Sequence, residues 1–385
     1  MSGRITVAMV AGEASGDQLA AHLIKALRDV RPDIDFVGIG GPRMGSAGFD
    51  AWWPAEKLSV RGYFEVLRHY RELSGIRRAL LARLLQTRPA AFIGVDAPDF
   101  NLWLERRLRD AGVPAIHYVS PSIWAWRGGR IKGIARSVSR MLCLFPFEPA
   151  LYEKEGVPVS YVGHPFADEI SPLPQRFDAR ERLALPQDAR IVALLPGSRQ
   201  SELRYHATVW IETARLLHER HPELRFLVPL ATRETRALFE QALWTCKARE
   251  LPITILFGHA RDALMACDAA LVASGTATLE AALCRAPHVM AYRMHALSWQ
   301  IMKRMAYQPW GSLPNIMAGR FVVPERLQGA ATPRELADAL DSLLDDEAAR
   351  DAQIAEFERI HAVLRQGTAA RAAAAILPHL PAAAP

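Results

Sequence analysis

The sequence predicts an α/β protein with two doubly wound domains, each a parallel sheet covered by helices on both faces. Short apolar runs alternate with helical patterns along the chain, and they lack the polar–apolar alternation of strands that face water on one side. The chain has 385 residues, 50% of them hydrophobic, whereas a single core stops growing beyond roughly 250–300 residues. The alternation is interrupted between residues 163 and 186, which favours two domains.

Eleven apolar runs are predicted as strands, six before this interruption and five after it. The first six are residues 5–10, 36–39, 91–95, 115–119, 141–144 and 159–162. The other five are residues 191–195, 225–229, 253–257, 269–273 and 288–291. Their spacing leaves room for a helix between most neighbours, which is typical of parallel sheets. Beyond Pro333 the pattern predicts helices over 335–344 and 348–364, followed by an Ala/Pro tail.

The interrupted stretch is predicted as the linker between the domains. It has no sustained periodicity and contains four prolines, Pro165, Pro172, Pro174 and Pro186. We therefore expect a first domain over residues 1–165 and a second over 187–346. The remaining segment, 347–385, is expected to carry a final helix that packs back on the first domain.

Composition excludes several classes of protein. The net charge of +6 is small for this length, and zinc-finger spacing, RNP-like motifs and arginine-rich tails are absent from the sequence, so no nucleic-acid partner is expected. Four cysteines without paired spacing predict buried free thiols in a reducing cytosol. The apolar run 5–11 is too short for a signal peptide, and no stretch approaches the roughly 18 apolar residues of a membrane span. A cytoplasmic protein is expected.

Residues 57–88 combine positive charge with aromatic and aliphatic side chains. Eight basic residues stand against three acidic ones when Glu56, just before this range, is counted; the basic residues are Lys57, Arg61, Arg68, Arg71, Arg77, Arg78, Arg83 and Arg88. A basic amphipathic helix of this kind can rest on an anionic membrane surface. The alternative is a solvated helix face over an ordinary core. We expect peripheral membrane association.

The strongest single motif is the junction after the run 269–273. Ser274-Gly275-Thr276 leads straight into a helical pattern, so the first free backbone amides of that helix point beyond the strand, where they suit a phosphate. Glu280 lies one turn further and can reach a ribose diol. The alternative is an ordinary strand-to-helix junction in which Ser274 is the N-cap.

A second motif, Gly197-Ser198-Arg199, follows the run 191–195. A glycine, a hydroxyl and an arginine at a helix start suit a diphosphate, because guanidinium pairs with phosphate oxygens in a bidentate manner. Both motifs follow strands, and ligands of open parallel sheets bind at the carboxyl ends of strands. The sequence Asp33-Ile34-Asp35 precedes its strand and lies at the wrong end for a metal site. Neither a metal nor a dinucleotide cofactor is expected.

In the first half, strand ends carry a candidate base and a candidate acceptor site. Gly12, Glu13 and Ser15 follow the run 5–10 and are predicted to face a ligand, unless Ser15 or Asp17 only caps the next helix. Asp96 follows the run 91–95, and a carboxylate there can deprotonate a hydroxyl. Asp99 competes for this role, although its place before a helix resembles an N-cap.

Ser120 and the tryptophans Trp124 and Trp126 follow the run 115–119. Tryptophans in a Pro/Ser loop suit contact with a sugar ring or an acyl chain. The alternative is that they pack beneath the loop.

Taken together, the motifs resemble those of a known family. They are AGEASGD, GGPRM, GVDAPDFN, HYVSPSIWAWR, FPFEPALYEKEGVPVSYVGHP, LLPGSRQSE, ASGTATLE and SLPNIMAGR. In this order, from about residue 5 to 333, they resemble the lipid-A-disaccharide synthases, glycosyltransferases of Gram-negative bacteria with the two-domain GT-B fold. The resemblance implies two Rossmann-like domains that face a central cleft.

The resemblance also implies an activity and roles for residues. Such an enzyme joins UDP-2,3-diacylglucosamine to 2,3-diacylglucosamine 1-phosphate through a β-1,6 linkage, inverts the anomeric carbon and releases UDP, without a cofactor. It implies that Asp96 is the base, that Arg199 and Glu280 contact the nucleotide, and that Asn315 and Gln328 complete the donor pocket. The acylated substrates imply work at the cytoplasmic face of the inner membrane. A homodimer is one alternative for its assembly.

Two other functions remain open. A UDP-sugar 2-epimerase shares the two-domain fold and needs no acylated acceptor. A non-enzymatic nucleotide-sugar sensor would leave Asp96 without a role. A transferase acting on a polyprenyl-linked acceptor would have different glycine loops in the first domain.

Overall fold

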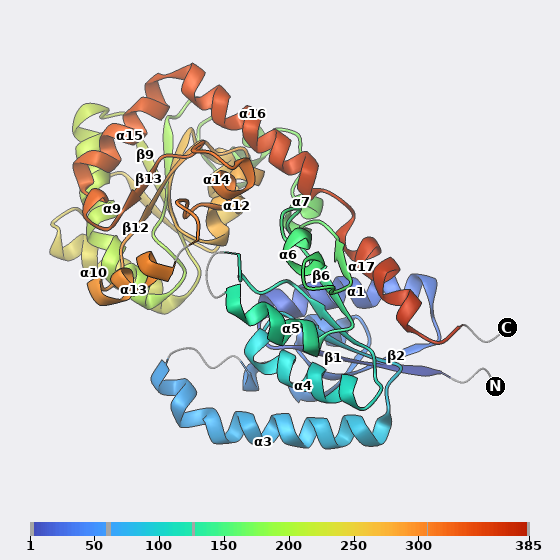
Figure 1. Ribbon diagram of the computed structural model, residues 1–385. Coiled ribbons are helices and arrows are strands. Elements are labelled where there is room, and N and C mark those ends of the chain that lie inside the picture. The colour runs from blue at the N-terminus through green and yellow to red at the C-terminus, as the bar shows by residue number, and fades with distance from the viewer. Residues whose placement is uncertain (1–3, 59–62, 125–127, 306, 383–385) are drawn as a thin grey trace. The chain divides into compact units, whose positions relative to one another are not determined.

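The computed structural model describes residues 4–58, 63–124, 128–305 and 307–382. The chain forms two compact units, Met1–Asp168 with Leu364–Pro385, and Glu169–Val363. In each unit, helices cover both faces of a sheet (Figure 1).

The first unit contains a seven-stranded sheet in the order β3-β2-β1-β4-β5-β6-β7, and all neighbouring strands are parallel. Its strands are β1 (Ile5–Ala11), β2 (Ile34–Gly40), β3 (Phe49–Pro54), β4 (Ala91–Val95), β5 (Ala115–Tyr118), β6 (Arg140–Cys143) and β7 (Val159–Tyr161). Its α-helices are α1 (Ala14–Val30), α2 (Pro42–Ser46), α3 (Tyr63–Thr87), α4 (Pro98–Asp110), α5 (Ile131–Ser137), α6 (Pro149–Glu153), α7 (Pro165–Glu169) and α17 (Thr368–Ile376).

The second unit contains a six-stranded parallel sheet in the order β10-β9-β8-β11-β12-β13. Its strands are β8 (Ile191–Leu195), β9 (Arg225–Leu230), β10 (Ile253–Phe257), β11 (Ala269–Ala273), β12 (His288–Tyr292) and β13 (Glu325–Leu327). Its α-helices are α8 (Arg176–Arg182), α9 (Gln200–Arg220), α10 (Arg233–Thr245), α11 (Ala260–Ala266), α12 (Thr276–Leu283), α13 (Ala296–Met305), α14 (Leu313–Ala318), α15 (Pro333–Asp345) and α16 (Glu347–Leu364).

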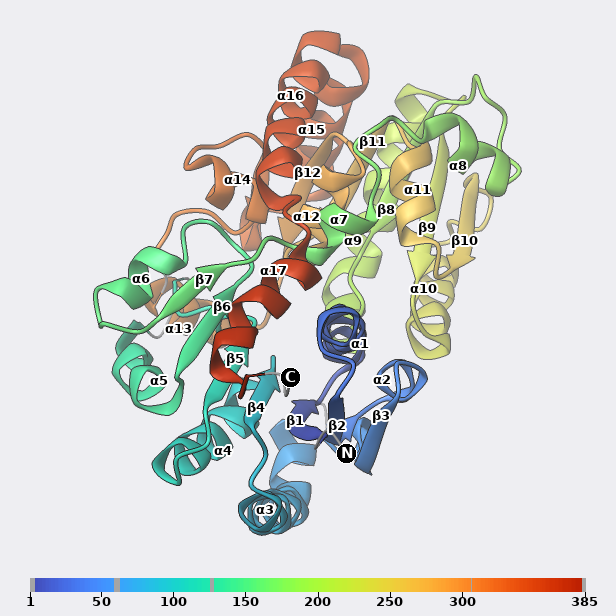
Figure 2. The same cartoon turned by 90° about the vertical axis from the view of Figure 1, so that its right-hand side faces the viewer.

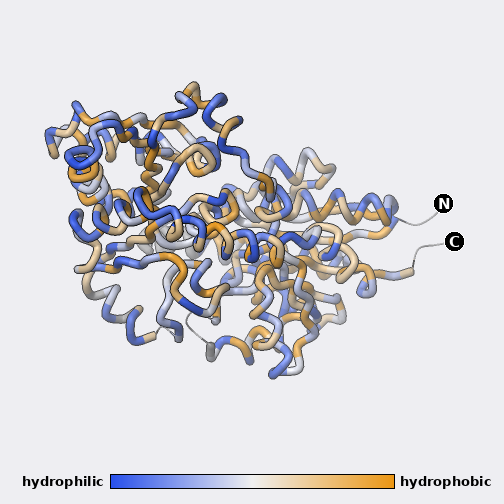
Figure 3. Tube along the Cα trace, turned by 90° about the horizontal axis from the view of Figure 1, so that it is seen from above, coloured by the Kyte–Doolittle hydropathy of each residue, from blue (hydrophilic) through white to orange (hydrophobic). Residues whose placement is uncertain are grey.

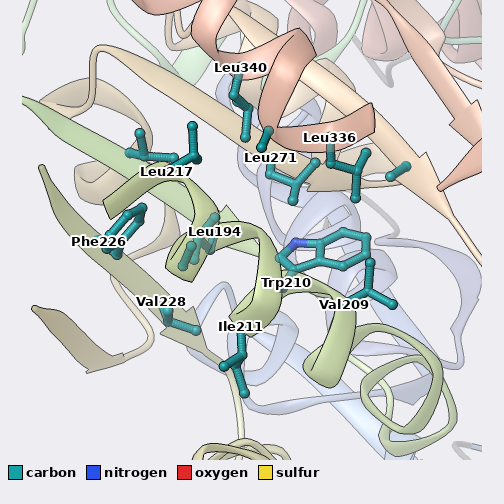
Figure 4. Packing of buried hydrophobic residues seen from close by; sticks show 14 of the residues in the cluster. Leu194, Val209, Trp210, Ile211, Leu217, Phe226, Val228, Leu271, Leu336 and Leu340 are labelled. Atoms are coloured by element: carbon teal, nitrogen blue, oxygen red, sulfur yellow. The ribbon is translucent and has the colours of Figure 1, made fainter. Parts of the chain in front are cut away.

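The central strands are apolar because both of their faces are covered. All five residues of β4, β8 and β11 are buried, as expected for strands between two helical layers. Along the helices, hydrophilic and hydrophobic segments alternate (Figure 3), which is typical of helices with one buried face. In the second unit, Trp210 of α9 is completely buried among Leu194, Leu271 and Leu336 (Figure 4).

The structure confirms the α/β fold class, and all eleven expected strands form. The sequence missed β3 and β13, both of which lie at the edge of their sheets. Three residues of β3 are exposed, and β13 has only three residues, all half-buried. Edge strands of this kind lack the continuous apolar run that reveals a central strand.

The stretch expected to be a linker contains two helices, α7 and α8. The periodicity of α8 is hidden by its polar residues, yet one of these, Arg180, is completely buried. Its guanidinium donates to the carbonyl oxygens of Ala266 and Gln187 and lies 3.2 Å from an Asp268 carboxylate oxygen. Tertiary hydrogen bonds, rather than an apolar stripe, therefore hold α8 to the second unit.

The C-terminal segment 347–385 is divided between the two units and does not pack as a whole on the first one. Phe357 of α16 packs in the core of the second unit, and the Gln353 side chain bonds to both backbone groups of His288. The following α17 packs on the first unit, beside α1 (Figure 2), and Leu380 after it joins the core of that unit. The Asp168 carboxylate accepts hydrogen bonds from the amides of Gly367 and Thr368 at its start.

Within the described ranges, no helix is both long and apolar enough to cross a membrane. All four cysteines are free, and Cys143, Cys267 and Cys284 are buried.

Candidate active site

Both sheets reverse their winding direction at one point. In the first unit the reversal lies between β1 and β4, and in the second it lies between β8 and β11. The connections on the two sides of such a point run away from each other, which leaves a crevice at the carboxyl ends of the two strands. Most of the residues singled out in the sequence follow these four strands.

In the second unit, α12 begins with open backbone amides. Gly275 is its N-cap and has φ +113°, a backbone conformation that side chains disfavour. The amides of Thr276 and Ala277 start the helix, so no carbonyl within the helix accepts from them. The first turn carries no acidic residue, so its partial positive charge faces outward and suits a phosphate. Ser274 is not the N-cap; its hydroxyl donates to the Gly311 carbonyl at 3.2 Å.

The start of α9 is different, because a carboxylate of the protein already accepts hydrogen bonds from the amides just before the helix. Glu202 Oε2 accepts from the amides of Ser198 and Arg199, at 3.0 and 3.2 Å. A side chain on Gly197, whose φ is +119°, would approach this oxygen to 2.5 Å. The contribution of this loop to an anion site is therefore the Arg199 guanidinium, which is 69% exposed and lies 3.3 Å from Glu202.

The two loops line one cavity of about 440 Å³, which we call the cradle. Its lining includes Ser198, Arg199, Ser274, Gly275, Thr276 and Glu280, and it extends to Leu230, Ala231 and Gly258 at the ends of β9 and β10. One carboxylate oxygen of Glu280 lies 2.7 Å from Arg261 Nε. The cradle therefore combines a cation, an open helix start and an oriented carboxylate.

Asn315 and Gln328 do not line the cradle. The Asn315 amide is completely buried; it donates to the Val323 carbonyl and Glu325, and it accepts from the amides of Val322 and Val323. Its hydrogen-bonding capacity is used inside the protein.

Gln328, oriented to match its neighbours, donates to the Met294 carbonyl and accepts from the Met294 amide, both at 3.2 Å. Neither residue is therefore part of the surface of the cradle.

His206 is a site residue that sequence reasoning missed. Its Nδ1 bonds to the Pro196 carbonyl at 2.7 Å, and its Nε2 accepts from the Arg293 amide at 2.9 Å, so it ties the β8 loop to the end of β12. Burial lowers its pKa, consistent with a neutral ring. A histidine at helical spacing among Leu203, Ala207 and Trp210 is the signal that could have revealed it.

In the first unit, Asp96 is half-buried at the tip of β4. It has φ +54° and the next residue, Ala97, has φ +43°. Two consecutive left-handed residues with side chains are costly unless surrounding contacts enforce them. The Asp96 amide donates to the Tyr118 carbonyl, and its own carbonyl accepts from Asn101 Nδ2, both at 2.8 Å. These bonds hold the backbone of Asp96 in this conformation at the end of β4.

Below Asp96 lies a buried polar cluster. Asn101, Glu105 and His117 are completely buried, and His117 Nδ1 lies 2.6 Å from a Glu105 oxygen. Burial raises the pKa of the Glu105 carboxyl, while His117 opposes this shift. Gly94 leaves room for the cluster, because a Cβ there would lie 2.1 Å from Glu105 Oε1.

Asp99 is not the N-cap of α4, a position that Ala97 holds. It lies in the first turn behind Pro98, its side chain is 82% exposed, and it forms an ion pair of 2.6 Å with Arg130. Asp99 therefore has an electrostatic partner.

The loop after β1 divides into exposed and buried residues. Glu13 and Ser15 are exposed, and Gly12 is buried against Leu58 and Ala97. Glu13 is the N-cap of α1. Asp17 instead accepts from the amides of Gly41, Arg43 and Met44, which fixes the loop after β2.

Ser120 and Trp124 belong to a largely buried cluster. The Ser120 hydroxyl lies 2.8 Å from the Tyr152 hydroxyl, and Trp124 Nε1 donates to Glu148 at 3.2 Å. The Trp124 ring meets Phe147 edge-on. The loop tryptophan is thus packed and paired. Trp126 lies outside the described residues.

Among the described residues, no three histidine, cysteine or acidic side chains gather in a way that could hold a metal ion.

Comparison with known proteins gives a consistent result. A family model described as lipid-A-disaccharide synthetase matches residues 7–377. Proteins named lipid-A-disaccharide synthase are similar to this chain: one from Aromatoleum aromaticum is 66% identical, over 97% of this chain and 96% of the relative. One from Dechloromonas aromatica is 58% identical, over 98% and 99%.

Solved structures with low sequence identity share the fold. The UDP-GlcNAc 2-epimerase of Neisseria meningitidis, bound to UDP-GlcNAc, aligns with a TM-score of 0.64 at 10% identity, over 97% of this chain and 99% of that one. Anabaena HepE, in complex with UDP and glucose, aligns with a TM-score of 0.57 at 14% identity, over 98% and 100%.

Gly275→Ala should weaken UDP binding by about tenfold or more. Space around Gly275 is open, so the effect arises from its backbone conformation, where a side chain costs roughly 1–3 kcal/mol and shifts the amides of α12. Calorimetric titration with UDP measures it. Gly329→Ala, also in open space but without a positive φ, is the matched control. Unchanged UDP affinity in Gly275→Ala would contradict the open helix start as the phosphate site.

The ionisation of Glu148 should lower the free energy of unfolding as pH rises. Burial raises its pKa from 4.5 to about 7, so the folded state holds a proton that the unfolded state releases between these values. Stability therefore decreases from about pH 4.5 to 7 and then levels off. Relative to Glu148→Gln, the free energy of unfolding of the unmodified protein should decline over this range in urea titrations. Glu153→Gln, at an exposed position, is the control. Parallel pH curves for the protein and Glu148→Gln would exclude this shift.

Proposed function

The chain belongs to the lipid-A-disaccharide synthetase family, and from that premise we propose how its two units share the reaction. It is a glycosyltransferase that forms the lipid A disaccharide. In the proposed reaction, the 6-hydroxyl of 2,3-diacylglucosamine 1-phosphate attacks the anomeric carbon of UDP-2,3-diacylglucosamine. The new O6–C1 bond forms as the bond from C1 to the diphosphate oxygen breaks, with inversion, and UDP leaves.

The second unit binds the donor in this proposal. The observation that carries the assignment is the cradle, in which the open start of α12 lies beside Arg199. Charge develops on the diphosphate as the bond to the sugar breaks, and preorganised donors stabilise such charge by roughly 3–4 kcal/mol each. We assign the diphosphate to α12 and Arg199, the ribose to Glu280, and the uracil ring to the end of the cradle near Leu230 and Gly258.

The first unit supplies the catalytic base. Asp96 accepts the proton of the acceptor 6-hydroxyl, and the hydrogen bond from Asn101 to its carbonyl supports its left-handed backbone conformation at the end of β4. We assign acceptor contacts to the exposed Glu13 and Ser15 beside it. Gly12, Ser120 and Trp124 are assigned supporting roles, because their side chains or backbone pack within this edge.

The epimerase alternative is not favoured. The solved epimerase shares only the fold at 10% identity, whereas relatives above 50% identity carry the synthase name over nearly their whole length. An assay with both diacylated sugars decides: UDP release must require both of them, and turnover of soluble UDP-N-acetylglucosamine alone would contradict the proposal.

Asp96→Asn should lower kcat by about 10²–10⁴-fold, because the acceptor hydroxyl loses its base. The affinity for UDP should stay within about twofold, since the cradle is untouched. Asp99→Asn is the matched control, as Asp99 already pairs with Arg130, and it should retain most of the activity. If Asp99→Asn were inactive and Asp96→Asn active, the two roles would have to be exchanged.

We also propose that α3 brings the first unit to an anionic membrane surface, as acylated substrates require. Part of its basic character is used internally: Arg83 stacks on Trp52 with its Cζ 3.8 Å from the ring centre, and Arg77 stacks on Trp103 at 4.5 Å. The support comes from Arg71 and Arg78, which are exposed.

The double variant Arg71→Glu/Arg78→Glu should bind vesicles of anionic phospholipid at least about tenfold more weakly, because each basic residue near such a surface contributes roughly 1 kcal/mol. Flotation assays at low and physiological salt measure this. Lys25→Glu/Lys154→Glu changes the same net charge at exposed sites away from α3. Equal losses in both double variants would indicate a net-charge effect instead.

A further inference from the structure

A second cavity adjoins the cradle in the second unit. It has a volume of about 710 Å³, within the range of small-molecule sites. Its lining shares Arg199, Glu202, Ser274 and Gly275 with the cradle. A ligand whose diphosphate lies at the start of α12 can therefore extend into this cavity without leaving the second unit.

The character of its wall differs from that of the cradle. Trp299 and Met302 line it from α13, Tyr307 and Trp310 from the segment after α13, and Leu327 from β13. Met302 is 40% exposed and Tyr307 is 63% exposed. Apolar side chains gathered beside a charged site mark a place where an apolar part of a ligand can be buried.

Two polar atoms in the same wall lack partners. Gln308 Oε1 and Trp310 Nε1 are buried, and neither has a hydrogen-bond partner among the described residues. A buried polar atom left unpaired costs roughly 1–3 kcal/mol. One is an acceptor and the other a donor, which matches the N–H and C=O groups of an amide link.

We propose that this cavity binds an acyl chain of the donor sugar, and that Trp299 and Met302 determine its preferred length. The inference rests on the proposed function, since it takes the diphosphate of the same donor to lie in the cradle. In a 2,3-diacylated glucosamine the 2-substituent is an amide and the 3-substituent an ester, and the amide link lies on the carbon next to the anomeric carbon that carries the diphosphate. The donor is therefore an amphiphile, with its charged diphosphate in the cradle and its acyl chain against the apolar wall.

The test is direct titration of donor without acceptor, below the critical micelle concentration, with UDP, UDP-N-acetylglucosamine and UDP-diacylglucosamines of two acyl lengths. Each buried methylene changes affinity by about fourfold, so the unmodified protein should lose about 15-fold in affinity when the chain is shortened by two carbons. In Trp299→Ala and Met302→Ser this dependence on length should fall below about threefold, while UDP affinity stays within about twofold.

The controls separate the explanations. Trp244→Ala removes a tryptophan that is 68% exposed on α10 and does not line the cavity, so it should behave as the unmodified protein. Unchanged length dependence in Met302→Ser would overturn the proposal. If Trp299→Ala lost UDP binding through misfolding, Met302→Ser would decide, because its side chain is partly exposed. A protein that binds the acylated donor with this length dependence, yet releases no UDP when acceptor is added, would contradict the proposed function alone.

Discussion

Each sheet of this protein is wound outward in two directions from a central pair of strands, and the placement of most candidate site residues depends on that reversal. Between β1 and β4, and again between β8 and β11, the following connections diverge. The strand ends are thus left uncovered. Asp96 and Glu13 follow the first pair, while Arg199 and Gly275 follow the second. The chemistry lies where the topology leaves backbone groups free.

Buried polar side chains give these loops their shape. His206 ties the β8 loop to β12, Asp17 fixes the loop after β2, and Asn101 holds the left-handed turn at Asp96. Loops at a ligand site cannot be held by apolar packing on their open side. Hydrogen bonds from the protein side therefore carry this task, and a buried polar group without its partner is costly.

The two helix starts at the cradle have similar sequences but different hydrogen bonding. Both follow a strand and a glycine with positive φ. Glu202 accepts hydrogen bonds from the two amides just before α9, those of Ser198 and Arg199, whereas Glu280 lies further along α12 and contacts Arg261 instead. Glu202 is the third residue of α9 and Glu280 the fifth of α12, and this difference of two residues separates the two helix starts.

The sequence by itself determined the fold class and the strand ends that carry the site. Central parallel strands are continuous apolar runs, and glycine turns mark where they stop. It also predicted Asp96, Arg199 and Gly275 as site residues, and the structure places them after β4, β8 and β11. The edge strands β3 and β13 and the polar helix α8 escaped it, because exposed or short segments carry no periodic apolar pattern.

Only the tertiary structure decided which of these residues line a cavity and which are paired inside the protein. The sequence could not show that the side-chain amide of Asn315 forms hydrogen bonds with Val322, Val323 and Glu325. Nor could it show that Glu148 accepts a hydrogen bond from Trp124. Such pairings join residues brought together by packing, and a side chain's hydrogen-bonding type does not reveal which partner is near. For the same reason, the apolar cavity beside the cradle, built from α13, β13 and the segment between α13 and α14, has no signature in the sequence.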